Sequence, residues 1–187
     1  RHSVSSSMKK VAILAAPGFE EIELIAPLDI LRRLNMEVML AGVQSDKVVS
    51  AHDVTVTTDT MLDKLHADKL DALVLPGGAG SWILRDTPEV IHLVKKMHEA
   101  GKLVAAICAA PSILGHMGLL NGRRAVCFPG YEQELSGAEI VSEPVVADGN
   151  IITSKGAGTA NHFAFALVAS LLGQERADSL KAALQWE

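Results

Sequence analysis

The chain has 187 residues, of which 49% are apolar and 21% are charged. This length suits one domain with a sizeable buried core, and the composition excludes a disordered or fibrous protein. The formal net charge of -5 is mild, and the 17 Lys and Arg residues are scattered along the chain. Because a nucleic acid would need a concentrated basic surface, we expect no nucleic-acid partner.

Hydrophobic runs and cysteines together indicate a cytoplasmic protein. Every apolar run is interrupted by Asp, Glu, Lys or Gly before it reaches the ~20 residues that span a bilayer, so we expect no membrane span. The two cysteines, Cys108 and Cys127, follow no signal peptide, and we expect free thiols in a reducing compartment. We interpret the polar residues 1–7 as an expression-tag remnant and residues 8–187 as a single domain.

Short apolar runs alternate with helical patterns along the chain. Residues 11–16 are typical of a strand buried on both faces, and residues 20–35 follow with a helical repeat that Pro27 should kink or restart. The further predicted strands are 38–43, 54–58, 70–75, 103–107 and 125–128, with a hairpin over 143–154 that turns at Asp148-Gly149-Asn150. The further predicted helices are 88–100, 111–119, 159–172 and 175–184. This alternation indicates an α/β fold with a mostly parallel sheet and helices on both faces.

Ligands of such sheets bind beyond the carboxyl ends of the strands, and Cys108 lies at one of these ends. It follows the strand 103–107 and precedes Pro111, a residue favoured in the first turn of a helix. A thiol at a helix N-terminus has a lowered pKa, because the dipole and free N–H groups stabilise the thiolate. The turn resembles a nucleophile elbow with cysteine in place of serine. A lone cysteine after an apolar strand is otherwise a small buried hydrophobe, and we interpret Cys127, within the strand 125–128, in that way.

Glu23 is the acid that we expect beside Cys108. It lies one helical turn past Phe19, on the helix that leaves the first strand. Pressed against a thiolate and apolar walls, its carboxyl would have a raised pKa and could donate a proton. The alternative, an exposed acid that stabilises the helix dipole, suits Glu20 and Glu21.

Glycine-rich turns follow two other predicted strands. Gly77-Gly78 allows close backbone approach, and its N–H groups could form an oxyanion hole with that of Ala109; a plain tight turn is the alternative. Residues 156–159 do not match a P-loop and no GxGxxG follows the first strand, so nucleotide binding is not expected. The seven histidines lack the spacing of metal ligands. We therefore expect neither a metal nor an organic cofactor.

Four motifs taken together resemble the ThiJ/PfpI superfamily, in its ThiJ-like branch. In chain order they are Gly18-Phe19-Glu20-Glu21-Ile22-Glu23, Leu73-Val74-Leu75-Pro76-Gly77-Gly78, Ala105-Ala106-Ile107-Cys108-Ala109-Ala110-Pro111 and Thr153-Ser154-Lys155-Gly156-Ala157-Gly158-Thr159. The likeness extends over the chain from Met8 onward. It implies a flavodoxin-like three-layer α/β sandwich, related to class I glutamine amidotransferases, and a homodimer.

The resemblance also implies roles for the site residues. Cys108 would be the nucleophile, Glu23 its hydrogen-bonded acid/base partner, and Gly78 and Ala109 the backbone donors. Activities attributed to the branch are glyoxalase activity without glutathione, removal of early glyoxal adducts from proteins, redox sensing through cysteine sulfinate, and holdase chaperoning. The implied substrates are α-oxoaldehydes such as methylglyoxal, or glycated protein side chains.

Departures from the wider pattern narrow these expectations. Where some relatives carry a histidine before proline, this chain has Phe128, as bacterial ThiJ-like proteins often do. Ala109 stands where peptidases of the PfpI type have a histidine, and His162-Phe163-Ala164 does not supply the late His-x-Glu of the amidotransferases, so neither activity is expected. Three functions stay open: a cysteine-dependent glyoxalase or deglycase, a redox-sensing stress protein in which Cys108 is oxidised, and a holdase.

Overall fold

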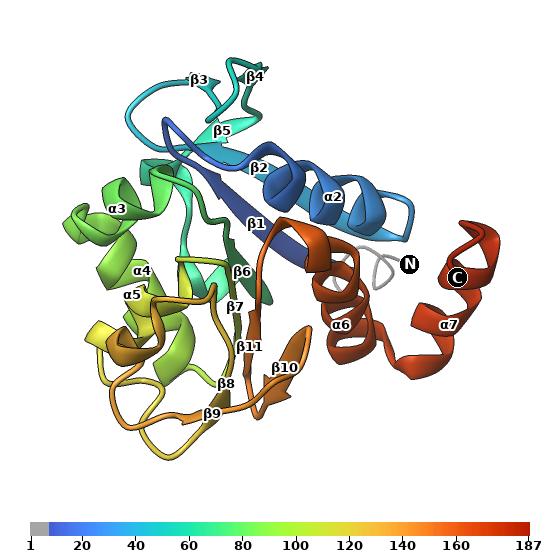
Figure 1. Cartoon of the computed structure of the whole chain (residues 1–187). Helices are drawn as coiled ribbons and strands as arrows, with labels where there is room; N and C mark the ends of the chain where they lie inside the picture. Colours follow the sequence, from blue (N-terminus) through green and yellow to red (C-terminus); the bar gives the residue numbers. More distant parts are fainter. Residues whose placement is uncertain (1–7) are drawn as a thin grey trace.

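The part of the chain that the structure describes, residues 8–187, folds around a seven-stranded central sheet in this computed structural model (Figure 1). The strands, in the order in which they lie side by side, are β10 (Val145–Asp148), β11 (Ile151–Ser154), β7 (Leu103–Ile107), β6 (Ala72–Leu75), β1 (Lys9–Ala15), β2 (Met36–Gly42) and β5 (Thr60–Met61). Neighbouring strands are parallel except β10 and β11, which form the predicted antiparallel hairpin. Residues 1–7, interpreted above as a tag remnant, lie outside the described residues.

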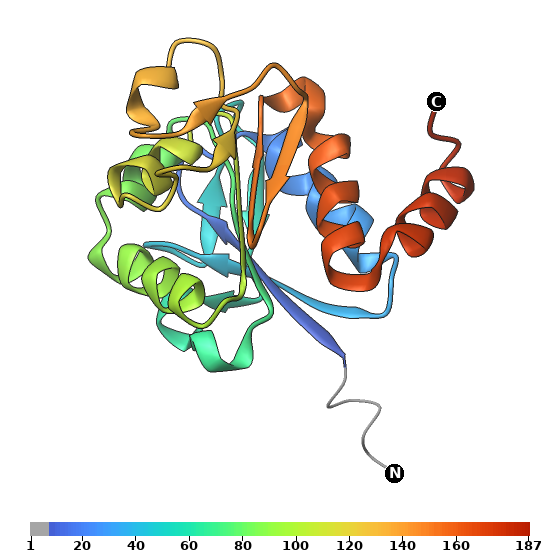
Figure 2. The ribbon, with the colours of Figure 1, turned by 90° about the horizontal axis from the view of Figure 1, so that it is seen from below.

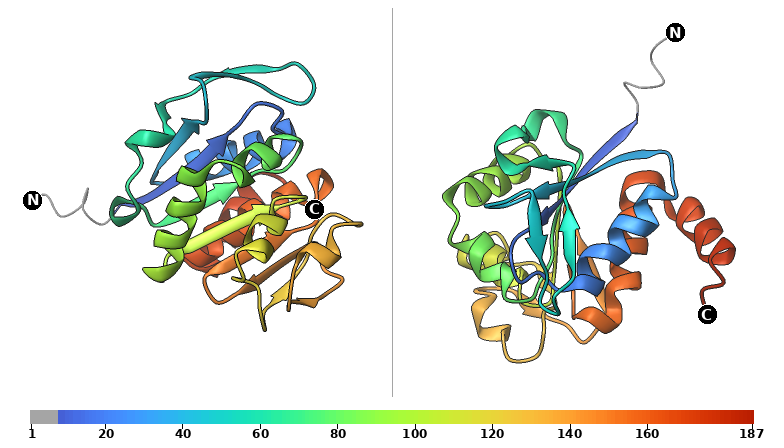
Figure 3. Two further views of the ribbon diagram at one scale, coloured as in Figure 1. Left: turned by 90° about the vertical axis from the view of Figure 1, so that its left-hand side faces the viewer. Right: turned by 90° about the horizontal axis from the view of Figure 1, so that it is seen from above.

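Helices cover both faces of this sheet. On one face lie α2 (Glu21–Arg32) and α6 (Ala160–Leu172), with α7 (Gln174–Ala183) against α6 at the periphery (Figure 2). On the other face lie α3 (Gly80–Arg85), α4 (Pro88–Glu99) and α5 (Pro111–His116) (Figure 3). Single 3₁₀ turns occupy Leu62–Lys64, Ala67–Lys69, Glu132–Glu134 and Ala157–Thr159. The predicted α/β class and mostly parallel sheet are confirmed. No helix within residues 8–187 is long and apolar enough to cross a membrane.

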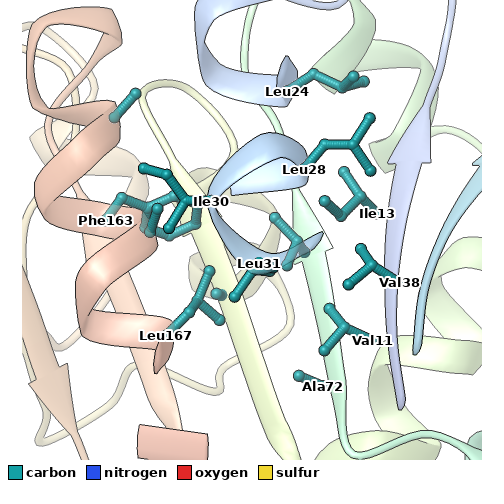
Figure 4. Packing of buried hydrophobic residues seen from close by; sticks show 14 of the residues in the cluster. Val11, Ile13, Leu24, Leu28, Ile30, Leu31, Val38, Ala72, Phe163 and Leu167 are labelled. Carbon is teal, nitrogen blue, oxygen red and sulfur yellow. The ribbon is translucent and has the colours of Figure 1, made fainter. Parts of the chain in front are cut away.

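Strand β1 is buried on both faces, as its uninterrupted apolar sequence predicts. Val11 and Ile13 pack toward α2 and α6, whereas Ala12 and Leu14 point to the opposite helical layer. Figure 4 shows the first of these clusters, in which Leu31 of α2 lies near the sheet residue Val11. The sheet is thus held between two apolar layers, which gives the ends of its central strands fixed positions.

Helix α2 continues through Pro27, so the predicted restart does not occur. Pro27 has no N–H to donate to the carbonyl of Glu23, four residues earlier, and this missing bond weakens the helix locally. The apolar side chains of Leu24, Leu28 and Leu31 are buried against the core on either side of the proline. Tertiary burial therefore keeps the helix in one piece.

Two short ladders lie outside the central sheet. Strands β3 (Lys47–Val49) and β4 (Thr55–Thr57) form an antiparallel hairpin, and β8 (Arg124–Ala125) pairs in parallel with β9 (Glu139–Ile140). The predicted strand over 125–128 is therefore wrong beyond its first residue.

Side-chain and loop hydrogen bonds replace the strand ladder after β8. The N–H of Val126 donates to Thr153 Oγ1 at 3.0 Å, and that of Phe128 donates to the carbonyl of Cys108 at 2.9 Å. Cys127 lies between these two residues, outside any strand, with its side chain 3% exposed. The interpretation of Cys127 as a buried residue is confirmed, although its predicted strand is not.

The carboxyl ends of four neighbouring parallel strands, β11, β7, β6 and β1, meet at one edge of the sheet. The turn at Gly77-Gly78 follows β6, Cys108 follows β7, and the segment that leads into α2 follows β1. The topology therefore brings the residues selected from the sequence to the same place.

Candidate active site

Cys108 occupies a sharp turn between β7 and α5. Its backbone φ is +68°, in the left-handed region that non-glycine residues rarely adopt. The turn is held from both sides, since the N–H of Cys108 donates to the carbonyl of Ser154 and its own carbonyl accepts the N–H of Phe128, both at 2.9 Å. Such a strained conformation persists only where the surroundings enforce it, and it is typical of functional turns.

Glu23 lies in the first turn of α2, and its side chain is fully buried. Its backbone N–H donates to Oε1 of Glu20, which caps the helix, at 3.0 Å. Its own Oε1 accepts the N–H of Gly77 at 2.9 Å. The other carboxyl oxygen, Oε2, accepts no N–H or O–H group among residues 8–187, and the Cys108 thiol is the group beside the carboxyl. A buried oxygen without a partner is costly, so this one is available to a proton, the thiol or a ligand.

Gly77 separates the carboxyl from the cysteine and has to be a glycine. A Cβ atom at this position would lie 2.5 Å from Oε1 of Glu23 and 2.7 Å from Cβ of Cys108. Gly78 adopts a φ of +81°, and a Cβ there would lie 2.7 Å from the N atom of Glu20. The pair of glycines thus permits the approach of α2 to the cysteine turn.

Burial raises the pKa of Glu23 from its ordinary value to about 7. The negative charge of Glu20 raises the pKa further, whereas the Cys108 thiol and the Gly77 N–H lower it. The predicted upward direction is confirmed. A carboxyl with this pKa exchanges its proton readily near neutral pH, which is the property that a general acid/base needs.

The pKa of Cys108 moves against the direction expected from the sequence. Burial raises the pKa of its thiol to about 12, and the neighbouring Glu23 carboxylate contributes to the rise. The backbone N–H groups of Ala109 and Gly78 bond to the sulfur and lower the pKa, without outweighing burial. The expectation of a lowered pKa was wrong because it counted the helix terminus and omitted desolvation and the adjacent carboxylate.

The two groups therefore have to be considered as one unit. Two negative charges side by side in a buried site are unfavourable, whereas one charge shared over sulfur and carboxyl is not. A thiolate forms here when the proton of Cys108 passes to Glu23, after which the neutral carboxyl no longer repels the sulfur. The structure thus brings together all four predicted site residues, Cys108, Glu23, Gly78 and Ala109.

Sequence reasoning missed two contributors to this geometry. Glu20 fixes the first turn of α2 through its bond to the N–H of Glu23. An acid directly before the first residue of a helix is a capping signal that could have identified this bond. Ser154 accepts the Cys108 N–H through its backbone. No side-chain pattern announces a backbone acceptor, so this second contribution could not be read from the sequence.

One trio of potential metal ligands lies close together within residues 8–187: Glu20, Glu21 and His52. Glu21 accepts bonds from the Ser50 hydroxyl at 2.6 Å and the His52 ring at 2.8 Å. The Ser50 bond and the His52 bonds lower the pKa of Glu21 to about 2. These contacts tie the β3–β4 hairpin to the start of α2, and they already use the carboxylate oxygens that a metal would need.

The chain as a whole has counterparts among known proteins. The model of the DJ-1/PfpI family matches residues 9–170, and the chain belongs to this family. The predicted ThiJ/PfpI resemblance is thereby confirmed.

Curated relatives and solved structures agree with this assignment. The chain is 37% identical to protein dj-1beta of Drosophila melanogaster over 172 residues, which cover 90% of this chain and 92% of the relative. It is 40% identical to a deglycase of Thermococcus kodakarensis over 151 residues, with 80% of this chain and 91% of the relative covered. A crystal structure of a mutant DJ-1 superfamily protein from Salmonella typhimurium superposes with a TM-score of 0.91 at 42% identity, covering 96% of this chain and 100% of that one.

Proposed function

We propose that the protein is a cysteine-dependent glyoxalase or deglycase, with Cys108 as nucleophile and Glu23 as acid/base. The observation that carries this proposal is the buried Glu23 carboxyl, with a pKa of about 7, beside a thiol on a left-handed turn. Relatives named as deglycases support the same class at the level of the family. The proposed substrates are α-oxoaldehydes such as methylglyoxal, or their early adducts on protein side chains.

The first step uses the shared proton of the site. The ionised Glu23 carboxyl accepts the thiol proton while the sulfur of Cys108 adds to the aldehyde carbon, forming a C–S bond and an alkoxide. In this proposal the N–H groups of Gly78 and Ala109, which hydrogen-bond to the sulfur, donate to this oxygen. Protonation of the alkoxide by Glu23 gives a hemithioacetal and restores the carboxylate.

The second step moves hydrogen within the substrate. Glu23 removes the proton from the former aldehyde carbon and returns a proton to the neighbouring ketone carbon through an enediol. The first carbon is thereby oxidised to a thioester and the second is reduced to an alcohol, so no external oxidant or reductant is needed. Water then cleaves the thioester, which releases a 2-hydroxy acid and regenerates the thiol. Each turnover consumes one α-oxoaldehyde and one water.

Release of lactate from methylglyoxal by the purified protein tests this proposal. We expect wild-type protein and the Cys127→Ser variant to produce lactate, and Cys108→Ser to produce none above the uncatalysed rate. Lactate formation by Cys108→Ser at the wild-type rate would exclude the proposed nucleophile. The absence of lactate with wild-type protein would exclude the glyoxalase activity.

A redox-sensing role is the second candidate, and the free Oε2 of Glu23 favours it. A carboxyl with a pKa of about 7 is protonated often enough to donate a hydrogen bond to a sulfinate on Cys108. Mass spectrometry after mild peroxide treatment should then find oxidation on Cys108 ahead of Cys127. Preferential oxidation of Cys127, or no effect of Glu23→Gln on the yield of sulfinate, would contradict this role.

We further propose that the chain forms a homodimer in the cytoplasm. Exposed apolar side chains gather on the first half of α2 and on the neighbouring β3–β4 hairpin: Ile22, Ile25, Val49 and Val54. Such a patch is expected to be covered in a soluble assembly. Sedimentation should give the mass of two chains, and Ile22→Glu should give one. A holdase would instead keep this patch open, and its protection of aggregating proteins would not require Cys108.

A further inference from the structure

Three aromatic side chains form a continuous row near the cysteine turn. Trp82 lies in α3, while Phe128 and Tyr131 lie in the loop after β8. The ring centroids of Trp82 and Tyr131 are 5.6 Å apart, and those of Tyr131 and Phe128 are 6.5 Å apart with an edge-on orientation. We call these three residues the aromatic row. Since aromatic residues make up 4% of the chain, their gathering in one place is a notable feature of this surface.

One end of the aromatic row is attached to the cysteine turn itself. The backbone N–H of Phe128 donates to the carbonyl of Cys108 at 2.9 Å. The Phe128 ring lies over Gly156, where a Cβ atom would be 3.3 Å from Cδ1 of the ring. Gly156 lies two residues after Ser154, whose carbonyl accepts the N–H of Cys108. Phe128 is therefore anchored to both backbone segments that hold the nucleophile.

The other end of the aromatic row lies in the helix that follows the turn of the proposed oxyanion donor, Gly78. The N–H of Trp82 donates to the carbonyl of Ala79, and that of Ser81 donates to the carbonyl of Gly78. Gly78 in turn bonds to the sulfur of Cys108. The row thus extends from the helix after the Gly78 turn to the Phe128 loop, and both of these segments adjoin the cysteine turn.

The aromatic row keeps apolar surface accessible. The Phe128 side chain is 47% exposed, and Trp82 and Tyr131 are half-buried. The guanidinium of Arg85 lies 4.8 Å from the centroid of the Trp82 ring and is also paired with Asp86 at 3.5 Å. Asp86 therefore already balances the charge of Arg85. The row offers planar apolar surface to a molecule that reacts with Cys108.

From this placement we propose that the aromatic row selects the substituent of the substrate, favouring α-oxoaldehydes with an aromatic group over methylglyoxal. This inference rests on the proposed function and names its substrate class. Aromatic rings gain from edge-on and offset contacts with other rings, whereas a methyl group has little area to bury. The chemistry is unchanged: phenylglyoxal and one water give mandelate, with oxidation of the aldehyde carbon and reduction of the ketone carbon.

Steady-state kinetics with phenylglyoxal and methylglyoxal test the proposal. We expect wild-type kcat/KM to be higher for phenylglyoxal, and Trp82→Leu and Phe128→Leu to lower it by about 3- to 10-fold, mainly through KM, with less than about 2-fold loss on methylglyoxal. Trp82→Phe, which keeps a ring, should retain most of the preference. Equal losses on both substrates, or a wild-type preference for methylglyoxal, would overturn the proposal.

Alkylation of Cys108 provides a readout that does not depend on turnover. In a Cys127→Ser background, the rates at which N-phenyl iodoacetamide and iodoacetamide alkylate Cys108 are measured separately. The ratio of the first rate to the second should be higher than the same ratio for a free thiol in solution. Trp82→Leu should reduce this ratio by about 3-fold or more. Trp186→Leu is the matched control, because Trp186 contacts His162 and Phe165 instead. If lactate and mandelate are absent but the alkylation ratio depends on Trp82, the glyoxalase proposal fails and recognition of aromatic groups stands. A ratio that Trp82→Leu leaves unchanged overturns the recognition itself.

Discussion

The two cysteines of this chain differ in their surroundings more than in their own acidity. Burial raises the pKa of both thiols, to about 12 for Cys108 and about 11 for Cys127. Cys108 adjoins the buried Glu23, whose pKa of about 7 makes it a proton acceptor near neutrality. The acid near Cys127 is Glu132, whose pKa is lowered by backbone hydrogen bonds. Glu132 therefore repels a thiolate without accepting its proton, so reactivity here depends on a matched acid beside the thiol.

Exchange of each cysteine for serine gives the largest expected effect and tests this comparison directly. We expect Cys108→Ser to lower kcat/KM for methylglyoxal by about 10³-fold or more, because a serine hydroxyl is a far weaker nucleophile in the absence of a stronger base. Cys127→Ser should change it by less than about 2-fold. Loss of activity in Cys127→Ser, with folding retained by circular dichroism, would contradict the division of roles.

Removal of the acid from the reactive pair should have the next largest effect. Glu23→Gln keeps an acceptor for the Gly77 N–H but cannot take the thiol proton, so we expect kcat/KM to fall by about 10²- to 10⁴-fold. In the wild-type protein, kcat/KM should rise as the pH passes through about 7, where Glu23 ionises. The variant should lack this rise. A variant with the wild-type pH profile would show that another group accepts the proton.

Sequence reasoning recovered the central elements because their signals are local. The apolar run of β1, the strand-ending Pro76-Gly77-Gly78 and the hairpin turn around Gly149 each act through backbone preferences and burial that can be read from a few residues. The strand expected at 125–128 failed because Val126 and Phe128 find hydrogen-bond partners, Thr153 and Cys108, that are distant in the sequence.

The site was less predictable than the fold, for a related reason. The positions of Cys108 and Glu23 follow from strand ends and helix spacing, but the pKa of the thiol depends on desolvation and on a charge brought from another part of the chain. The aromatic row likewise joins Trp82 to Tyr131, residues with no common local pattern. Interactions of this kind form between residues that are distant in the sequence and come together on folding, so a short segment of sequence does not predict them.

The buried acid should also lower the stability of the folded protein above neutral pH. The folded-state pKa of Glu23 is raised to about 7 from an ordinary 4.5, so the folded state binds its proton more tightly. Its contribution is therefore most favourable below the unfolded pKa and is lost as the pH rises through about 7. At pH 8, Glu23→Gln should increase the free energy of unfolding by up to roughly 3 kcal/mol, and at pH 5 by much less. Urea titrations at the two pH values measure this, and an equal change at both would contradict the burial of the charge.

The smallest expected effect comes from a substitution that removes the charge of Glu20 but keeps its role as a helix cap. The negative charge of Glu20 raises the pKa of Glu23, while its Oε1 accepts the Glu23 N–H. Glu20→Gln keeps the acceptor and removes the charge, so the pKa of Glu23 should fall and the rise of kcat/KM with pH should begin at lower pH. The maximal kcat/KM should change by less than about 2-fold.

Glu21→Gln is the matched control, because Glu21 is not among the groups that shift the pKa of Glu23. If the pH profile of Glu20→Gln coincides with that of the wild type, the ionisation that sets the pH profile is not that of Glu23. The difference in reactivity between Cys108 and Cys127 would then need another cause.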